Sequence, residues 1–185
     1  SWTSSFNIAF NKNKVLSLTE NQESFTSIIT WDNTWNSYPA YIVKLNQPLG
    51  LMYGYVWDGV YQYSDFYKNT AGVYVLKDNV PTNGNARNTI QPGDIKYKDI
   101  NGDGVVNTGD YTIIGNGIPK HTGGFSNNFT YKGFDLNIFF QWSYGNDIQN
   151  TNRLVFDGNG LGKTNLNQYA SYNDRWSPDN TASIN

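Results

Sequence analysis

Apolar and polar residues alternate along the second half of residues 122–144. Every second position there is apolar, namely Phe134, Leu136, Ile138, Phe140, Trp142 and Tyr144. Successive side chains of a β-strand point to opposite faces, so this spacing gives one apolar face and one polar face. The residues between them are Asp135, Asn137, Phe139, Gln141 and Ser143, of which only Phe139 is apolar. We therefore predict a long two-faced strand.

The residues before this strand predict its partner. Phe125, Phe129 and Tyr131 alternate with small or polar residues, and the dipeptide Lys132-Gly133 separates the two runs. A two-residue connection with a glycine fits a tight hairpin turn, because glycine adopts positive φ without strain. The predicted hairpin pairs Tyr131 with Phe134, Phe129 with Leu136 and Phe125 with Phe140, which places both apolar stripes on one face.

The length of this hairpin bears on its environment. Each strand has about ten residues, enough to cross a bilayer when tilted, whereas strands of soluble proteins have about five or six. Trp142 and Tyr144 at a strand end fit the aromatic belt of a membrane barrel. Strands of soluble sandwiches also alternate, however, so the pattern alone leaves a membrane wall and a soluble sheet open.

Shorter patterns predict the rest of the chain. Residues 2–10 alternate again, and after a polar turn the run Val15 to Leu18 is expected to complete a second hairpin. Residues 38–56 predict short strands, and residues 146–163 predict a polar loop. Helical spacing is shown by Leu166, Tyr169, Ala170, Asn173 and Trp176. It predicts a short loop helix that ends before Pro178. The pattern gives roughly six to eight strands, about four of them long enough to span a bilayer, and the closed single-chain barrel needs at least eight such strands.

Composition narrows the class. The chain has 185 residues, of which 16% are aromatic and 15% charged, and this mixture favours an all-β protein. The net charge of −2 offers no basic surface for nucleic acid. The absence of Cys excludes disulfides and thiolate chemistry within these residues. Because the sequence begins in an alternating run and ends in a polar one, we expect a fragment of a longer chain.

An acidic segment, residues 99–110, matches the template of a calcium-binding loop. The candidate oxygen ligands occupy template positions 1, 3, 5, 7 (a backbone carbonyl), 9 and 12, which correspond to Asp99, Asn101, Asp103, Val105, Asn107 and Asp110. Gly104 falls at the sharp-turn position. Asp110 replaces the usual Glu and is one methylene shorter. The alternative is an Asp/Asn/Gly turn that needs no metal.

No motif of catalysis stands out, and we expect no enzyme. Patterns such as GxSxG, HExxH and the P-loop are missing, and His121 is the only histidine. A second function class is a secreted calcium-binding, carbohydrate-binding β-sandwich module, since Trp31, Trp35, Tyr53, Tyr55, Trp57, Tyr61 and Tyr63 offer rings for sugars. That module requires Phe134, Leu136, Ile138 and Phe140 to pack inside a two-sheet core. A dockerin-like module would carry two calcium loops followed by helices, and only one loop is present.

Ordered motifs along the chain resemble the C-terminal part of SusC/RagA-type TonB-linked (TonB-dependent) outer-membrane transporters. They are YIVKLNQPLGLMYG (41–54), WDGVYQ (57–62), QPGDIKYKDINGDGVVNTGD (91–110), IIGNGIPKHTGG (113–124), FSNNFTYKGFDLNIFFQWSYGNDI (125–148) and DRWSPDN (174–180).

The resemblance implies that residues 1–185 are part of the barrel domain: antiparallel transmembrane strands of a 22-stranded barrel, with long extracellular loops. The plug domain would lie outside these residues. The whole protein would sit in the outer membrane of a Gram-negative cell and import oligosaccharides or peptides. A SusD-like surface lipoprotein and the TonB–ExbB–ExbD complex would be its partners. Asp135, Asn137, Gln141 and Ser143 would line the lumen, and the acidic loop would be extracellular.

Overall fold

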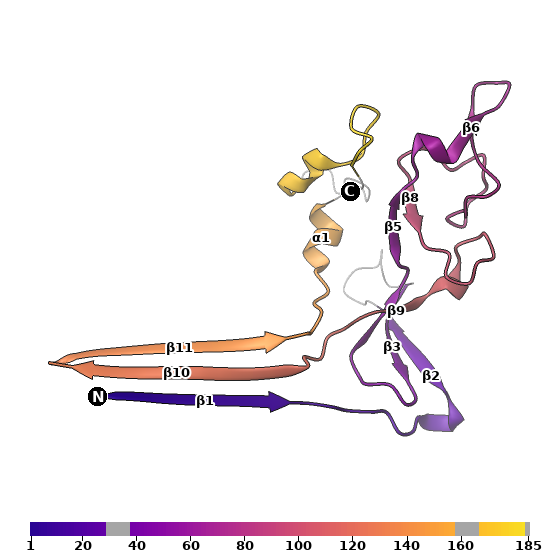
Figure 1. Ribbon diagram of the computed structural model, residues 1–185. Coiled ribbons are helices and arrows are strands. Elements are labelled where there is room, and N and C mark those ends of the chain that lie inside the picture. The colour runs from indigo at the N-terminus through magenta and orange to yellow at the C-terminus, as the bar shows by residue number, and fades with distance from the viewer. Residues whose placement is uncertain (29–37, 158–166, 184–185) are drawn as a thin grey trace. The chain divides into compact units, whose positions relative to one another are not determined.

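The computed structural model describes residues 1–28, 38–157 and 167–183 (Figure 1). It is all-β, with antiparallel sheets and little helix, as predicted. Two compact units make up the chain: Ser1–Tyr53 with Ile113–Ile148, and Gly54–Thr112 with Gln149–Asn185. Among the described residues, no helix has the length and hydropathy needed to cross a membrane. The described strands form no closed barrel.

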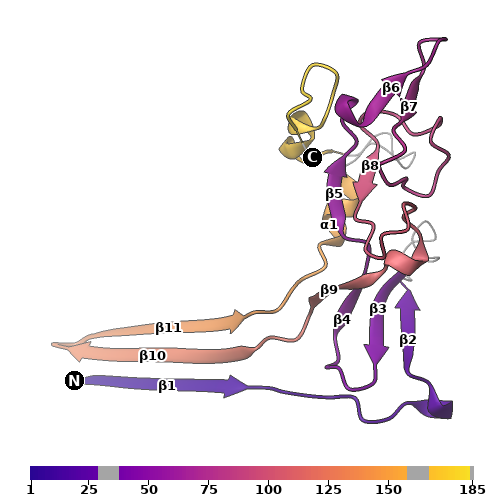
Figure 2. The same ribbon diagram turned by 45° about the vertical axis from the view of Figure 1, so that its right-hand side comes forward.

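The first unit contains a three-stranded sheet in which β1 (Trp2–Phe10), β10 (His121–Tyr131) and β11 (Phe134–Tyr144) lie side by side (Figures 1 and 2). The predicted pairs are confirmed: Tyr131 faces Phe134, Phe129 faces Leu136 and Phe125 faces Phe140. The turn residues Lys132 and Gly133 have φ values of 47° and 82°. Positive φ at both central residues is the hairpin turn whose twist matches that of the strands.

One face of this sheet is apolar across all three strands. Phe6 lies opposite Phe125, which lies opposite Phe140, and flanking rows continue the stripe. Aromatic rings meet across strands: Trp2 stacks on Phe129 with centroids 5.9 Å apart, and Phe6 stacks on Trp142 at 5.7 Å. The side chains remain exposed, as shown by Phe134, Phe140, Phe6 and Leu136 at 79%, 60%, 62% and 56%. The two-sheet core of the sandwich alternative is therefore not formed by these residues.

Polar side-chain atoms on the apolar face form hydrogen bonds with one another. Asn127 Oδ1 accepts hydrogen bonds from Trp2 Nε1 and Ser4 Oγ, both at 3.0 Å. At the far end of β10, His121 Nδ1 accepts a bond from Trp142 Nε1 at 3.2 Å. A polar group in an apolar environment is costly unless it is hydrogen-bonded. These contacts satisfy the polar atoms within the sheet itself.

The prediction of a second hairpin, between residues 2–10 and 15–18, is wrong. β1 pairs with β10 and not with residues 15–18, which form no strand. Val15 instead donates a backbone hydrogen bond to Gln47 and accepts one from Asn46, each at 2.9 Å. β10 offers β1 nine paired positions whose apolar residues fall on the same face, whereas residues 15–18 are too few to match them. The longer pairing therefore determines where β1 lies.

A second sheet of the first unit has the order β2-β3-β4-β9. Its strands are β2 (Ser24–Ile28), β3 (Pro39–Lys44), β4 (Leu51–Gly54) and β9 (Thr112–Asn116), and the 3-10 turn η1 (Thr19–Asn21) precedes β2. The short strands predicted within residues 38–56 are thus confirmed. Ile42 and Leu51, which face each other across β3 and β4, are buried.

The second unit has a small core of its own. Tyr61, Phe66, Leu76 and Ile90 are buried together, and the Tyr61 hydroxyl donates to the Pro81 carbonyl at 2.7 Å. The elements around this core are β5 (Trp57–Val60), η2 (Tyr63–Asp65), β6 (Phe66–Lys68), β7 (Tyr74–Leu76), β8 (Ile95–Tyr97) and η3 (Thr108–Asp110). β5 pairs with β8, and β6 pairs with β7.

Helix is found at different positions from those predicted. The expected helix before Pro178 is a 3-10 turn, η4 (Ala170–Asp174), and Leu166 lies outside the described residues. The α-helix of the structure, α1 (Thr151–Phe156), lies within the segment predicted as a loop. Its start is capped, since Asn150 Oδ1 accepts a bond from the Arg153 amide at 3.4 Å. The cap and the Arg153–Asp157 ion pair outweigh the polar, glycine-rich composition.

Trp176 attaches the C-terminal segment to the core of this unit. Its Nε1 donates to Gln62 Oε1 at 3.1 Å, and its ring lies 5.7 Å from that of Tyr63. The six-membered ring covers Gly93, where a Cβ atom would overlap it. Gly93 also has a φ of +94°, a conformation that favours glycine.

We expect Gly93→Ala to loosen this attachment, because the methyl group displaces Trp176 as well as straining the backbone. The clash should cost about 1–3 kcal/mol beyond the strain. Hydrogen exchange of peptides from residues 170–183 measures this loosening, and exchange should be faster in the variant. Gly72→Ala is the matched control, because Gly72 has a φ of +78° and nothing within 4 Å of an added Cβ. Equal exchange in both variants would contradict the attachment through Trp176.

Candidate functional site

The acidic loop, residues 99–110, runs from the end of β8 to η3 in the second unit. Asp99 closes its first half: Oδ1 accepts from the Gly102 amide and Oδ2 from the Gly104 amide, each at 2.7 Å. Gly102 and Gly104 have φ values of 77° and 84°, so glycine permits the turn that brings both amides to one carboxylate.

The side chains that follow continue this pattern. Asp103 Oδ1 accepts from the Val105 amide at 2.8 Å, and the Asn101 carboxamide donates to Asp103 Oδ2 at 3.1 Å. Asn107 donates from its side chain to the Val105 carbonyl, also at 3.1 Å. Four of the six candidate ligands thus contact one another through amide hydrogen bonds.

Asp110 ties the two ends of the loop together. It has no exposed surface, and its Oδ1 accepts from the amides of Ile100 at 2.8 Å and Asn101 at 3.2 Å. Its Oδ2 accepts from the Asn107 amide at 2.8 Å, which completes a capping box at η3. These backbone hydrogen bonds, that of Asn107 first, stabilise the carboxylate and lower the pKa of Asp110 below its ordinary value of 3.8.

The geometry can be compared with what a calcium ion needs. Such an ion takes six to eight oxygen ligands, often including a bidentate carboxylate at the last loop position. The oxygens of Asp99, Asn101, Asp103 and Asn107 lie in one loop. A cation would have to replace the hydrogen bonds that the Asn101 carboxamide donates to Asp103 and the Asn107 carboxamide donates to the Val105 carbonyl. Within the described residues, no group of three or more His, Cys, Asp or Glu side chains is placed to hold a metal.

The loop is fixed to the rest of its unit. Thr82 donates a backbone hydrogen bond to Gly104 at 3.0 Å and accepts one from Val106 at 2.9 Å. Val106 and Thr82 are both buried. The turn that carries the acidic side chains is therefore attached to buried residues at its base, while Asp103 is exposed and Asp99 is half-buried.

A cluster of three tyrosines lies in the same unit. The Tyr55 ring is 4.2 Å from that of Tyr111 and 5.0 Å from that of Tyr97. Burial and a hydrogen bond with Tyr111 raise the pKa of Tyr55 from 10.0 to about 12. Tyr55, one of the candidates for sugar binding, thus packs against two other tyrosine rings, which is a structural role.

The other aromatic candidates for sugar binding are distributed differently. Tyr61 is fully buried, and Tyr63 packs against Trp176 and Tyr74. Trp57 is about half exposed and lies opposite Tyr97. Trp31 and Trp35 lie outside the described residues. Among the described candidates, Tyr61 is buried, and Tyr55 and Tyr63 pack in separate ring contacts.

Four residues expected to line a lumen share the polar face of the three-stranded sheet. Asp135 lies opposite Thr130, Asn137 opposite Asn128, Gln141 opposite Gly124 and Ser143 opposite Thr122. The Asn137 carboxamide donates to Asn128 Oδ1. This face offers hydroxyl and carboxamide groups to water, and Phe139 lies among them.

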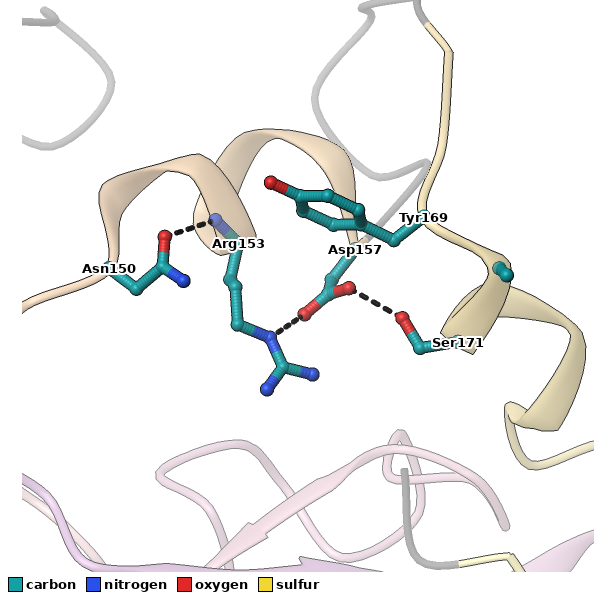
Figure 3. A pocket seen from close by; sticks show the side chains of 6 residues that line it. Asn150, Arg153, Asp157, Tyr169 and Ser171 are labelled. Carbon is teal, nitrogen blue, oxygen red and sulfur yellow. Dashed lines mark hydrogen bonds and ion pairs between the residues drawn. The ribbon is translucent and has the colours of Figure 1, made fainter. Parts of the chain in front are cut away.

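A shallow pocket between α1 and η4 was not anticipated from the sequence (Figure 3). Arg153 pairs with Asp157 Oδ2, and Asp157 Oδ1 accepts from Ser171 Oγ at 2.8 Å. Both contacts, that of Arg153 first, lower the pKa of Asp157. Because the cation and the carboxylate neutralise each other, the pocket presents no free charge for a ligand. The i,i+4 spacing of Arg153 and Asp157 was the available sequence signal for this helix.

Comparison with known proteins finds related sequences in one organism, Formosa agariphila. "TonB-dependent receptor P3" is 33% identical over 180 residues, which cover 97% of the chain and 16% of the relative. "TonB-dependent receptor P39" is 33% identical over 168 residues, covering 80% and 15%. "TonB-dependent receptor P26" is 27% identical over 182 residues, covering 98% and 16%. The chain thus spans about a sixth of the length of these curated relatives. No protein-family model matches it.

We expect Asp110→Asn to speed hydrogen exchange in residues 99–110 at pH 7, because the amide has one acceptor oxygen and no charge. The pKa of Asp110 is lowered on folding, so its carboxylate stabilises the folded loop fully above pH 3.8. This stabilisation is lost as the pH falls through the folded-state pKa. The difference between variant and native protein should therefore shrink below pH 3.8. Asp78→Asn, at a fully exposed side chain, is the control and should change nothing. A difference that persists at low pH would contradict the role of the charge.

Proposed function

We propose a function for this chain from its family, since it belongs to the TonB-dependent receptors. It would form part of the barrel wall and external loops of an outer-membrane transporter of the SusC/RagA type. The observation that carries the proposal is the three-stranded sheet of β1, β10 and β11. It has one exposed apolar face and one hydroxyl- and amide-rich face, over strands of nine and eleven residues. This is the arrangement that a wall between lipid and a water-filled lumen requires.

The apolar face suits lipid in a second way. Its buried or half-buried polar atoms, at Asn127 and His121, find hydrogen-bond partners within the face. Lipid offers no such partners, so a wall must supply them. A water-exposed sheet would have no need of this arrangement.

The whole transporter would import oligosaccharides or peptides. A SusD-like surface lipoprotein would close its external side, and the TonB–ExbB–ExbD complex would supply energy through parts of the protein outside these residues. The second unit, with its acidic loop and tyrosine cluster, would belong to the external loops. The likeness to TonB-dependent receptors supports the transporter and its TonB partner. The SusD-like partner and the substrate class rest on the motifs that resemble SusC/RagA-type transporters.

The competing function is a secreted calcium-binding, carbohydrate-binding sandwich. It needs the apolar face as a core, yet Phe134 and Phe140 are largely exposed. A soluble domain that exposes a continuous apolar face of this size would aggregate or bind a partner. The wall of a barrel accounts for the exposure directly.

Cysteine labelling tests the wall. In a full-length receptor whose other cysteines are replaced, Asn137→Cys and Gln141→Cys should react with a water-soluble maleimide in outer membranes. Leu136→Cys and Phe140→Cys should react at least about tenfold more slowly, because a thiol in lipid does not ionise. The segment contains no Cys of its own. Equal labelling at all four positions would rule out a lipid-facing stripe, and labelling in urea provides the reference for full access.

We also propose that residues 99–110 bind calcium through the oxygens of Asp99, Asn101, Asp103, Val105 and Asn107, with Asp110 at the last position. What supports this is the template spacing and the placement of these oxygens in one anchored loop. The ion would replace the amide contacts of Asn101 and Asn107 and offset the repulsion between Asp99 and Asp103. Its role would be to stiffen an external loop.

Limited trypsin cleavage after Lys98 tests the calcium site. Calcium should slow cleavage several-fold in the native receptor, and the double variant Asp99→Ala/Asp103→Ala should cleave at the same rate with calcium or with chelator. Asp78→Ala, outside the loop, should keep the calcium effect. If the native protein cleaves equally fast under both conditions, the loop is an Asp/Asn turn without a metal.

A further inference from the structure

Four Asn-Gly dipeptides occur in the chain, and their asparagines are Asn83, Asn101, Asn116 and Asn159. In such a dipeptide the backbone nitrogen of the glycine can attack the carboxamide carbon of the asparagine, because no side chain hinders its approach. This reaction contributes to the thermal lability of asparagine. Asn159 lies outside the described residues. The other three dipeptides differ in the hydrogen bonds of the glycine amide and of the asparagine side chain.

Two of the three glycine amides donate short hydrogen bonds. The Gly102 amide donates to Asp99 Oδ1 at 2.7 Å, and the Gly117 amide donates to the Gly50 carbonyl at 2.9 Å. An amide nitrogen must give up its proton before it acts as a nucleophile, and a hydrogen bond opposes this loss. Both nitrogens are therefore restrained from attack.

The asparagines that precede these glycines are restrained as well. Asn101 Oδ1 accepts from the Asp103 amide at 2.9 Å, and its Nδ2 donates to Asp103 Oδ2 at 3.1 Å. Asn116 Oδ1 accepts from the Ile118 amide at 2.8 Å. Such bonds between a side chain and the neighbouring backbone hold the carboxamide in one orientation. Attack at Asn101 or Asn116 therefore requires several hydrogen bonds to break together.

Asn83 is held less firmly. The Gly84 amide donates no hydrogen bond to any group in the part of the chain that the structure describes. Asn83 Nδ2 donates to the Ile95 carbonyl at 3.3 Å, and Asn83 Oδ1 accepts from the Asn85 amide at 3.4 Å and from Asn85 Nδ2 at 3.1 Å. The first two contacts are longer than the ordinary range. The nucleophile is thus free, and the carboxamide that it would attack is weakly bound.

We propose that Asn83 is a site of spontaneous deamidation, at which water converts the asparagine into aspartate or isoaspartate. The Gly84 amide proton passes to hydroxide, the Gly84 nitrogen forms a bond to Asn83 Cγ, and the Cγ–Nδ2 bond breaks. The departing nitrogen takes a proton from water and leaves as ammonia, so that a succinimide ring remains. Water then opens this ring. Cleavage of the new bond to Cγ gives aspartate, and cleavage of the original peptide bond gives isoaspartate.

The site lies at the base of the acidic loop. Thr82 comes directly before Asn83, and its backbone bonds to Gly104 and Val106 at 3.0 and 2.9 Å. Isoaspartate adds a methylene group to the main chain directly after Thr82, and both products lose the amide donor of Asn83. We therefore expect deamidation to loosen residues 99–110. The inference is independent of the proposed transport, because all these contacts lie within the second unit.

Timed incubation of the purified full-length receptor tests the proposal. A mildly alkaline buffer supplies hydroxide, a metal chelator removes bound cations, and peptic digestion at low pH stops the reaction before mass spectrometry. Asn83 should deamidate at least about tenfold faster than Asn101 and Asn116, because a hydrogen bond that must first break can be worth about that factor. In urea the three sites should react at similar rates, since they share the same dipeptide.

Two variants test the physical cause and the consequence. Asp99→Ala removes the acceptor of the Gly102 amide, so it should speed deamidation of Asn101 several-fold and leave the rate at Asn83 unchanged. Asn83→Gln keeps a carboxamide but would have to close a larger ring, and it should stay unmodified. Hydrogen exchange in residues 99–110 should become faster on incubation of the native receptor and stay constant in Asn83→Gln.

The rates in the folded receptor decide the proposal. Equal rates at the three asparagines, or a slower rate at Asn83 than at Asn101 or Asn116, would overturn it. An unchanged rate at Asn101 in Asp99→Ala would contradict the control by the glycine amide. Deamidation of Asn83 without faster exchange in residues 99–110 would contradict its link to the acidic loop.

Discussion

The register of β10 against its two neighbours is the constraint on which the long sheet depends. Side chains alternate faces along a strand, so a shift by one position would move every apolar residue to the other face. In the observed register, Phe6, Phe125 and Phe140 form one row, and Ser5, Ser126 and Phe139 form the next. The separation into an apolar and a polar face, and the function proposed from it, follow from this pairing.

Sequence patterns predicted the elements whose information is local. The hairpin of β10 and β11 is one such element, because its turn residues and both stripes lie within a single short segment. The pairing of β1 with β10 was missed, since Trp2 and Asn127 are 125 residues apart and alternation does not say which strand is the partner. The helix α1 was missed because its cap, Asn150, and its ion pair stand in a polar glycine-rich stretch. The prediction of a loop followed this composition and overlooked the cap and the ion pair.

The acidic loop shows the same limit at the level of side chains. Its spacing placed Asp99, Asn101 and Asp103 in one turn, and the positive φ angles of Gly102 and Gly104 were implied by the template. What spacing does not reveal is where a carboxylate points. Asp110 is buried and bonds to three backbone amides, so it holds the loop closed whether or not a cation is present. A loop that is already closed by its own hydrogen bonds is a prepared frame for an ion, but it gains less order from binding one.

Two consecutive glycines in β10 explain how the register is held from both sides. Trp142 covers Gly123 on the apolar face and reaches Phe6 on β1, whereas Phe139 approaches Gly124 on the polar face. Any side chain at Gly123 would collide with the Trp142 ring and with the Asn7 carbonyl. Rings over glycines are a known means of pinning strand register, and here one strand, β11, supplies a ring to each face. Covering Gly124 leaves most of the Phe139 ring exposed. Strand pairing therefore accounts for the position of the Phe139 ring, which remains 59% exposed.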